Sequence, residues 1–175
     1  AQETFDWTGG GLDGNWSNPL NWTGPASVPN GNDVLNFSGG VNLVTFNDLP
    51  VPALDQHRIF FTPTAGEFIL NGAGLTLHDF GGAAPKIENN ALFTNQTINL
   101  AVALNGTNSG GAGEINPVDG NLLFGNTVDL AGTTQLRIWG NNGNSVTFNG
   151  AVTSSGNGGG NSVALDQYST VVFGG

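Results

Sequence analysis

The chain has 175 residues, enough for a single domain with a substantial core, and only 9% of them are charged. Its three basic residues leave a net charge of -10, which excludes the cationic surface that nucleic acids and anionic membranes require. Cysteine is absent, so there is no disulfide and no thiolate metal site, and no apolar run approaches the roughly 20 residues of a membrane helix.

The N-terminal sequence indicates export. It begins Ala1-Gln2-Glu3, without an initiator Met, as does a mature chain from which a signal peptide has been removed. We therefore expect a secreted protein.

Residues 5–37 are rich in aromatic side chains and lie outside the repeat that begins near residue 75. Three of the four tryptophans fall here, namely Trp7, Trp16 and Trp22. The terminal unit of a repeat stack must close an exposed apolar end, and Trp buries a large area, so we interpret these residues as a cap. The alternative is a platform of exposed rings on which sugars stack. We divide the single structural domain into an N-terminal extension with its aromatic cap (1–37) and repeat coils (38–175).

An apolar-x-apolar pair then recurs along the chain at intervals of 23 to 25 residues. The pairs are Leu75/Leu77, Ile98/Leu100, Leu122/Phe124, Val146/Phe148 and Val171/Phe173. Alternation inside each pair indicates a strand with one buried face. Asn-Gly and Asp-Gly dipeptides between the pairs, from Asn71-Gly72 to Asn157-Gly158, are suited to the positive φ angles of corners.

The repeat predicts an all-β fold, a parallel β-helix (β-solenoid) of about 24 residues per coil. An antiparallel sandwich is the alternative, but its strands need not repeat in phase. The hexapeptide period of left-handed β-helices is missing, so we expect a right-handed coil. Asn side chains at corners should form amide ladders. One interior file should contain Leu77, Leu100, Phe124, Phe148 and Phe173.

Two groups of motifs in the chain form a pattern that is also found in a known family. The first is W-x-G, then N-W-S, N-W-T, a proline and D-V-L-N-F, within the first 37 residues, and the second comprises the segments 145–152 and 169–175. Together they resemble bacterial autotransporter-like surface proteins that carry autotransporter-associated β-strand repeats. The resemblance implies a right-handed β-helix on the bacterial cell surface, with a role in adhesion, matrix or surface filaments.

Residues able to perform catalysis are few. His57 and His78 are far from each other in the sequence, and we interpret both as surface residues. The G-x-S-x-G motif of a nucleophilic serine is not present. We therefore predict no enzyme and no cofactor. Parallel β-helices include pectate-lyase-like enzymes, however, and stacking could bring Asp129 near Glu114, close to Arg137. A carbohydrate-binding or carbohydrate-cleaving β-helix is therefore the alternative function.

Two turns contain oxygen donors that could hold calcium. They are residues 30–33 and 116–121. Neither has the spacing of a known calcium loop, and Asx-turns explain both, so no metal site is predicted.

The C-terminal repeat is expected to leave an apolar end that nothing in the sequence covers. Either the chain continues or subunits associate head-to-tail, with the N-terminal stretch of one chain adding as a donor strand to the last coil of the next. The residues expected in this contact are Ala1, Gln2, Glu3, Thr4, Phe5, Val171, Val172 and Phe173. The sequence thus predicts an extracellular structural or adhesive subunit that associates with itself, with surface polysaccharide as a second candidate partner.

Overall fold

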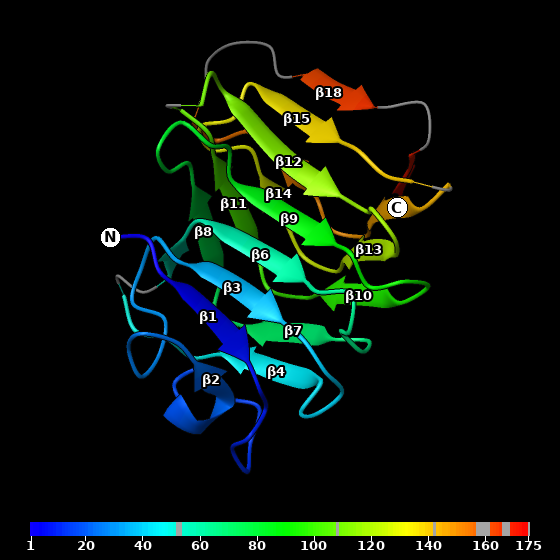
Figure 1. Cartoon of the computed structure of the whole chain (residues 1–175). Coiled ribbons are helices and arrows are strands. Elements are labelled where there is room, and N and C mark those ends of the chain that lie inside the picture. The colour runs from blue at the N-terminus through cyan, green and yellow to red at the C-terminus, as the bar shows by residue number, and fades with distance from the viewer. Residues whose placement is uncertain (52–53, 108, 142, 157–161, 166–168, 175) are drawn as a thin grey trace.

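The strands wind into a β-solenoid of about 6 turns with roughly 26 residues per turn. The structure, a computed structural model, describes residues 1–51, 54–107, 109–141, 143–156, 162–165 and 169–174. In Figure 1 the strands of the front sheet point to the right while successive turns rise toward the top, so the coil is right-handed. The predicted right-handed parallel β-helix is confirmed, with a turn slightly longer than the sequence repeat indicated.

Three sheets form the faces of the coil, and all their strand pairs are parallel except the pair of β1 with β2. Sheet A contains β2 (Trp22–Thr23), β1 (Thr4–Trp7), β3 (Val34–Phe37), β6 (Arg58–Phe61), β9 (Lys86–Asn89), β12 (Ala112–Asn116), β15 (Gln135–Ile138) and β18 (Ser162–Leu165). Sheet B contains β4 (Val44–Asn47), β7 (Ile69–Gly72), β10 (Asn95–Ile98), β13 (Asn121–Phe124), β16 (Ser145–Phe148) and β19 (Thr170–Phe173). Sheet C contains β5 (Asp55–Gln56), β8 (Leu75–His78), β11 (Val102–Asn105), β14 (Val128–Asp129) and β17 (Val152–Thr153).

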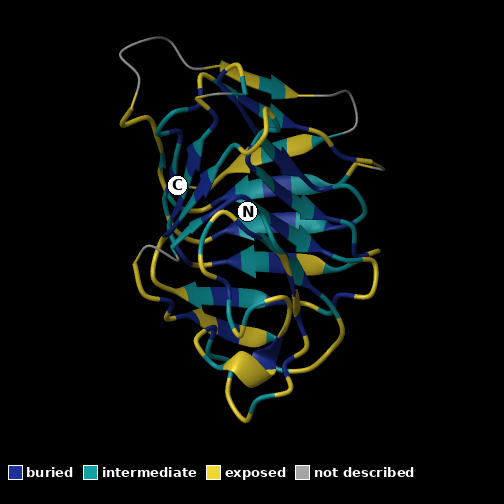
Figure 2. Cartoon of the chain, turned by 60° about the vertical axis from the view of Figure 1, so that its left-hand side comes forward, coloured by how far each residue is buried: buried dark blue, intermediate teal, exposed yellow. Residues whose placement is uncertain are grey.

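Alternate side chains of each strand point into one continuous core. Figure 2 shows buried and less buried residues alternating along the strands, with exposed residues gathered in the turns and at the two ends. In sheet B the rings of Phe124 and Phe148 stack with centroids 5.3 Å apart, and those of Phe148 and Phe173 with centroids 5.6 Å apart. Each ring therefore contacts its equivalent in the next coil, as the repeat predicted.

The predicted interior file is correct for these three phenylalanines and wrong for its first two members. Ile98 pairs with Leu70 on one side and Phe124 on the other, so Leu70 and Ile98 complete the file. Leu77 lies on β8 in sheet C, and Leu100 lies past the end of β10. The error arose because only a short corner separates β7 from β8. Leu77 of sheet C is therefore close enough in sequence to Leu70 of sheet B to be mistaken for the member of the file in this coil.

Amide ladders connect the corners of successive coils, as predicted. Asn99 Nδ2 donates to Asn71 Oδ1 at 3.0 Å, and Asn121 Nδ2 donates to Asn95 Oδ1 at 2.8 Å. These bonds satisfy polar side chains at the edges of sheet B while linking one coil to the next.

Glycines in the Asn-Gly dipeptides serve two different purposes. Gly72 has a φ of +105°, the left-handed conformation that the corner was predicted to need. Gly150 does not have a positive φ, but a Cβ at this position would collide with the backbone of Asn126 in the preceding coil. Here the requirement is close approach of two coils, which the sequence does not reveal. The dipeptide at residues 157–158 lies outside the described residues.

The aromatic segment closes the N-terminal end of the core. Trp7, Trp16 and Trp22 are buried, and Trp22 meets both other indoles edge to face. The Trp16 indole N–H donates to Thr45 Oγ1 at 3.0 Å, and the Trp22 indole N–H donates to the Trp16 carbonyl at 2.8 Å. These three rings therefore have no free face on which a sugar could stack. The 3₁₀ helix η1 (Pro19–Asn21) lies within this segment.

The N-terminal strand is part of the chain's own sheet. Thr4 to Trp7 pair in register with Val34 to Phe37 of β3, and Phe5 is buried. The Glu3 carbonyl also accepts a hydrogen bond from Val34 N at 2.8 Å. The expectation that this stretch is free to act as a donor strand is therefore wrong, because alternating Phe5 and Trp7 belong to the core. Strand β3 lies within residues 1–37, the range predicted as extension and cap, but it pairs with β1 and β6 as part of sheet A.

The last described coil exposes apolar side chains. Phe173 on β19 is 65% exposed, and Val163 and Leu165 on β18 are 47% and 51% exposed. Equivalent positions one coil earlier, such as Phe148 and Ile138, are buried. The described residues at this end of the stack thus include exposed apolar side chains, among them Val172 and Phe173, while Val171 packs partly against the core. A role of these residues in assembly stays a prediction.

Candidate functional site

The three basic residues of the sequence lie in one file on the outer face of sheet A. Arg58 pairs with Lys86, Lys86 with Glu114, and Glu114 with Arg137, on the four successive strands β6, β9, β12 and β15. Their inward neighbours Ile59 and Ile87 are buried, so the alternation of the strands directs the charged side chains outward.

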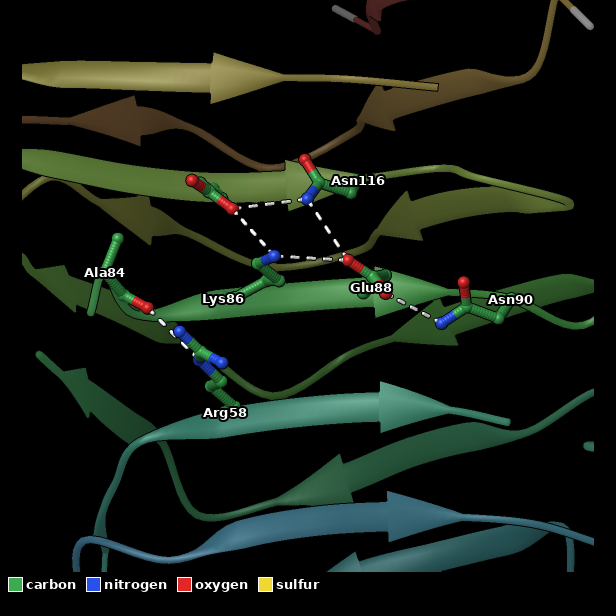
Figure 3. Close-up of polar contacts among 7 residues, drawn as sticks. Arg58, Ala84, Lys86, Glu88, Asn90 and Asn116 are labelled. Carbon is green, nitrogen blue, oxygen red and sulfur yellow. Dashed lines mark hydrogen bonds and ion pairs between the residues drawn. The ribbon is translucent and has the colours of Figure 1, made fainter. Parts of the chain in front are cut away.

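Lys86 connects two carboxylates at the centre of this face. Its ammonium lies 3.0 Å from Glu114 Oε2 and 3.4 Å from Glu88 Oε2. Asn116 Nδ2 donates to the same two oxygens, at 3.4 Å to Glu114 and 3.3 Å to Glu88 (Figure 3). We call Lys86, Glu88, Glu114 and Asn116 the sheet A cluster. Four polar side chains on two neighbouring strands thus hold one another in place.

The amide oxygen of Asn116 has no hydrogen-bond partner. Asn116 is only 5% exposed, and its Oδ1 is buried. Figure 3 shows this oxygen turned away from the carboxylates and the nitrogen turned toward them. The opposite orientation would place the oxygen against two negatively charged groups, so the cluster itself fixes the direction of the amide. A buried acceptor without a donor costs about 1–3 kcal/mol, which a ligand hydroxyl could recover.

A groove with a volume of about 370 Å³ opens beside the cluster. Its lining residues are Lys86, Glu88, Glu114, Asn116, Val118, Trp139, Gly140 and Asn141. Trp139 directly follows β15 and is 55% exposed, unlike the three buried tryptophans of the cap. Because Ile115 pairs with Ile138, the next residues Asn116 and Trp139 fall side by side at this edge of the groove. The groove therefore combines one aromatic ring with charged and amide groups.

The two arginines of the file have different neighbours from Lys86. Arg58 Nε donates to the Ala84 carbonyl at 3.3 Å, and Arg137 Nε donates to Gln135 Oε1 at 2.7 Å. Neither residue lines the groove. They flank it along the stack and reduce the negative charge of this face.

Stacking does not bring Asp129 near Glu114, the carboxylate pair considered for the alternative function. Asp129 lies on β14 in sheet C, where its Oδ1 accepts from Thr153 Oγ1 at 3.1 Å and from Ser155 N at 2.9 Å. Glu114 instead meets Glu88, one coil away in the same sheet. The signal in the sequence is a shared polar-Ile-polar pattern at 86–88 and 114–116. It was missed because these strands are offset by 28 residues, more than the assumed repeat.

The two histidines lie in neighbouring coils and have structural roles, with the His57 ring against the backbone of His78. His57 is buried, not at the surface as expected, and its Nδ1 lies 2.6 Å from the His78 carbonyl oxygen. Burial lowers the pKa of His57 below its ordinary value. His78 Nε2 lies 3.5 Å from Asp55 Oδ1. In the described part of the chain these contacts account for both rings without a substrate.

The candidate calcium turn at residues 30–33 is held by the Asp33 carboxylate, which binds backbone N–H groups that precede it in the chain and does not form the expected Asx-turn. The buried Asp33 carboxylate accepts backbone N–H groups of Asn30 at 3.0 Å, Gly31 at 3.3 Å and Glu3 at 3.1 Å. Among the described residues, no group of three or more His, Asp or Glu side chains could hold a metal ion. The carboxylate that seemed available to a cation is therefore used to fix the start of β3.

No family model matches this chain, and comparison with curated proteins and with solved structures found no similar protein. None of the helical structure in the described residues has the length and hydrophobicity to cross a membrane. The site must therefore be interpreted from its own chemistry.

Proposed function

We propose that this chain is an extracellular structural and adhesive solenoid of the bacterial cell surface, and that it binds through the outer face of sheet A. The observation that supports this proposal is the groove beside the sheet A cluster, where an exposed Trp lies next to an unpartnered buried amide oxygen. The motif resemblance in residues 1–37, 145–152 and 169–175 supports the location and the adhesive role.

A parallel β-helix is well suited to such a surface. Its strands repeat every ~4.8 Å along the stack, and stacked repeats present continuous binding surfaces. The cluster bridges two adjacent strands, β9 and β12, whose backbones are hydrogen-bonded to each other. Side chains fixed in this way lose little freedom when a ligand binds, which favours binding.

The geometry favours binding over hydrolysis. Glycoside hydrolysis requires one carboxyl group that donates a proton and space between the pair for a water molecule or for the anomeric carbon. Here Lys86 Nζ and Asn116 Nδ2 both lie between Glu88 and Glu114. The carboxylates are therefore in place to accept hydrogen bonds.

Adhesion of coated beads tests this proposal. Beads carrying the chain should bind to bacterial cell envelopes, and the double substitution Glu88→Gln/Glu114→Gln should reduce binding at least about tenfold, since it disrupts the cluster that orients the groove. Asp129→Asn is the matched control, because Asp129 is an acid on the outer face of sheet C. Equal binding by wild type and the double variant would contradict the proposal. A polysaccharide-cleaving activity lost in Glu88→Gln would show that the chain is an enzyme instead.

A further inference from the structure

We infer that the sheet A groove binds a neutral, hydroxyl-rich saccharide, one sugar ring of which packs on Trp139. This inference rests on the proposed role of sheet A as the binding surface and adds the chemical class of its ligand. Three properties of the groove point to it: the exposed aromatic ring, the unpartnered amide oxygen, and the sign of the charged groups.

Trp139 supplies the apolar contact. The other tryptophans bury their rings in the core, whereas Trp139 leaves 55% of its surface exposed at the edge of a polar groove. An aromatic ring in this position offers a flat, apolar face together with an N–H donor. The C–H face of a pyranose ring is also flat and apolar, while its rim consists of hydroxyls, so it matches a ring surrounded by polar groups.

Asn116 supplies a directed acceptor. Its amide nitrogen is held by Glu88 and Glu114, so its oxygen cannot rotate to find a donor within the cluster. The oxygen is buried and unpartnered, and the residue lines the groove beside Trp139. This oxygen has almost no accessible surface in the unliganded chain, so a sugar hydroxyl donates to it once the side chains at the edge of the groove move aside. The Trp139 ring, on which the sugar packs, and the nearby Asn116 oxygen, which accepts from one hydroxyl, together define the orientation of the sugar.

The charges favour a neutral ligand over an acidic one. The groove itself is lined by two carboxylates and one ammonium, whereas Arg58 and Arg137 of the same face lie outside its lining. Sugar hydroxyls can donate to the carboxylate oxygens, whereas a uronate or phosphate group would be repelled by them. The groove volume of about 370 Å³ is suited to a short segment of an oligosaccharide.

Titration with defined oligosaccharides tests the inference. The probes are neutral hexasaccharides of β-1,4-glucan, β-1,4-mannan and α-1,6-mannan, with hexagalacturonate as the acidic counterpart. At least one neutral probe should bind by calorimetry and shift the Trp fluorescence. Trp139→Ala should weaken its affinity at least tenfold, Trp139→Phe should retain most of the affinity, and the fluorescence shift should disappear in both. Leu12→Ala, which removes an exposed apolar side chain from the N-terminal cap, is the matched control and should bind as wild type does.

The outcomes separate this inference from the proposed function. No binding of any neutral probe at millimolar concentration would overturn it, as would unchanged affinity in Trp139→Ala or preferential binding of hexagalacturonate. If bead adhesion still depends on Glu88 and Glu114, the proposed binding face stands while the neutral-saccharide assignment fails. If adhesion is also independent of these residues, both fail.

Discussion

His57 shows how a single residue couples the stability of the coil to pH. Its ring is buried with Nδ1 against the His78 carbonyl, and desolvation by burial lowers its pKa, with a smaller contribution of the same sign from Arg58. The unfolded chain takes up a proton at this ring near pH 6.5, whereas the folded chain does so only at lower pH. Between these two values the unfolded state binds more protons, so stability falls as the pH drops.

Denaturant unfolding of the wild type and of His57→Gln from pH 8 to pH 5 measures this effect. We expect the free energy of unfolding of the wild type to decrease relative to the variant below about pH 6.5, and the difference to be constant above it. The contact of His78 with Asp55 is present in both proteins and should largely cancel in the difference. A difference that does not change over the whole range would contradict the assignment.

At the scale of one strand, β16 tests the stacked core. Phe148 lies between Phe124 and Phe173 in the file of sheet B, whereas the next residue, Asn149, is exposed at a corner. Phe148→Asp would place a charge without a partner in a dry interior and should cost about 4 kcal/mol or more of the free energy of unfolding. Asn149→Asp should cost much less. Thermal unfolding of both variants measures the comparison, and equal destabilisation would contradict the observed register.

Individual strands also show how far the sequence could predict the fold. In sheet B the steps between Phe124, Phe148 and Phe173 are nearly constant, so the repeat located β13, β16 and β19 correctly. Further toward the N-terminus the turns vary in length, and there the assumed spacing mixed residues of two sheets. Strand β4 departs from the pattern altogether.

The polar residues of β4 face inward. Thr45 and Asn47 are buried, while Val44 and Phe46 are 49% and 47% exposed. Both inward polar side chains have partners: Thr45 accepts the indole N–H of Trp16 in the cap, and Asn47 Nδ2 donates to the Ala73 carbonyl in the next coil at 3.0 Å. Alternation of apolar residues alone would assign the opposite faces, because the hydrogen bonds that decide the orientation come from residues far away in the sequence.

The same limit applies to the candidate site. The sequence identified the aromatic cap and the scarcity of bases, but it could not place Glu88 beside Glu114, since a shift of a few residues in register changes which side chains meet. Nor could it distinguish the exposed Trp139 from the buried Trp16, because exposure depends on which coil covers each ring. Both the register of neighbouring strands and the exposure of a ring depend on how the coils stack, which the sequence of one coil does not determine.

At the scale of the whole molecule, the two ends of the stack differ. The N-terminal end is closed by the tryptophans of the cap and by β2, which pairs antiparallel to β1. The last described coil instead leaves Val163, Leu165 and Phe173 about half or more exposed. In a stack of repeats, stability is a sum of nearest-neighbour contacts, so a coil whose apolar side chains are covered on one side only is stabilised less than a coil between two others.

We therefore expect the 175-residue chain to associate through its last coil. The donor strand expected from the sequence is occupied in sheet A, and the tryptophans of the cap are buried, so we expect the apolar residues of two last coils to meet about a twofold axis and not in a head-to-tail contact. Sedimentation velocity should show a concentration-dependent monomer–dimer equilibrium that Leu165→Lys and Phe173→Lys shift toward monomer, whereas Leu12→Lys on the cap should leave it unchanged. A wild type that remains monomeric at all concentrations would contradict this expectation. Filaments in electron micrographs, lost in both Phe173→Lys and Leu12→Lys, would support head-to-tail assembly instead.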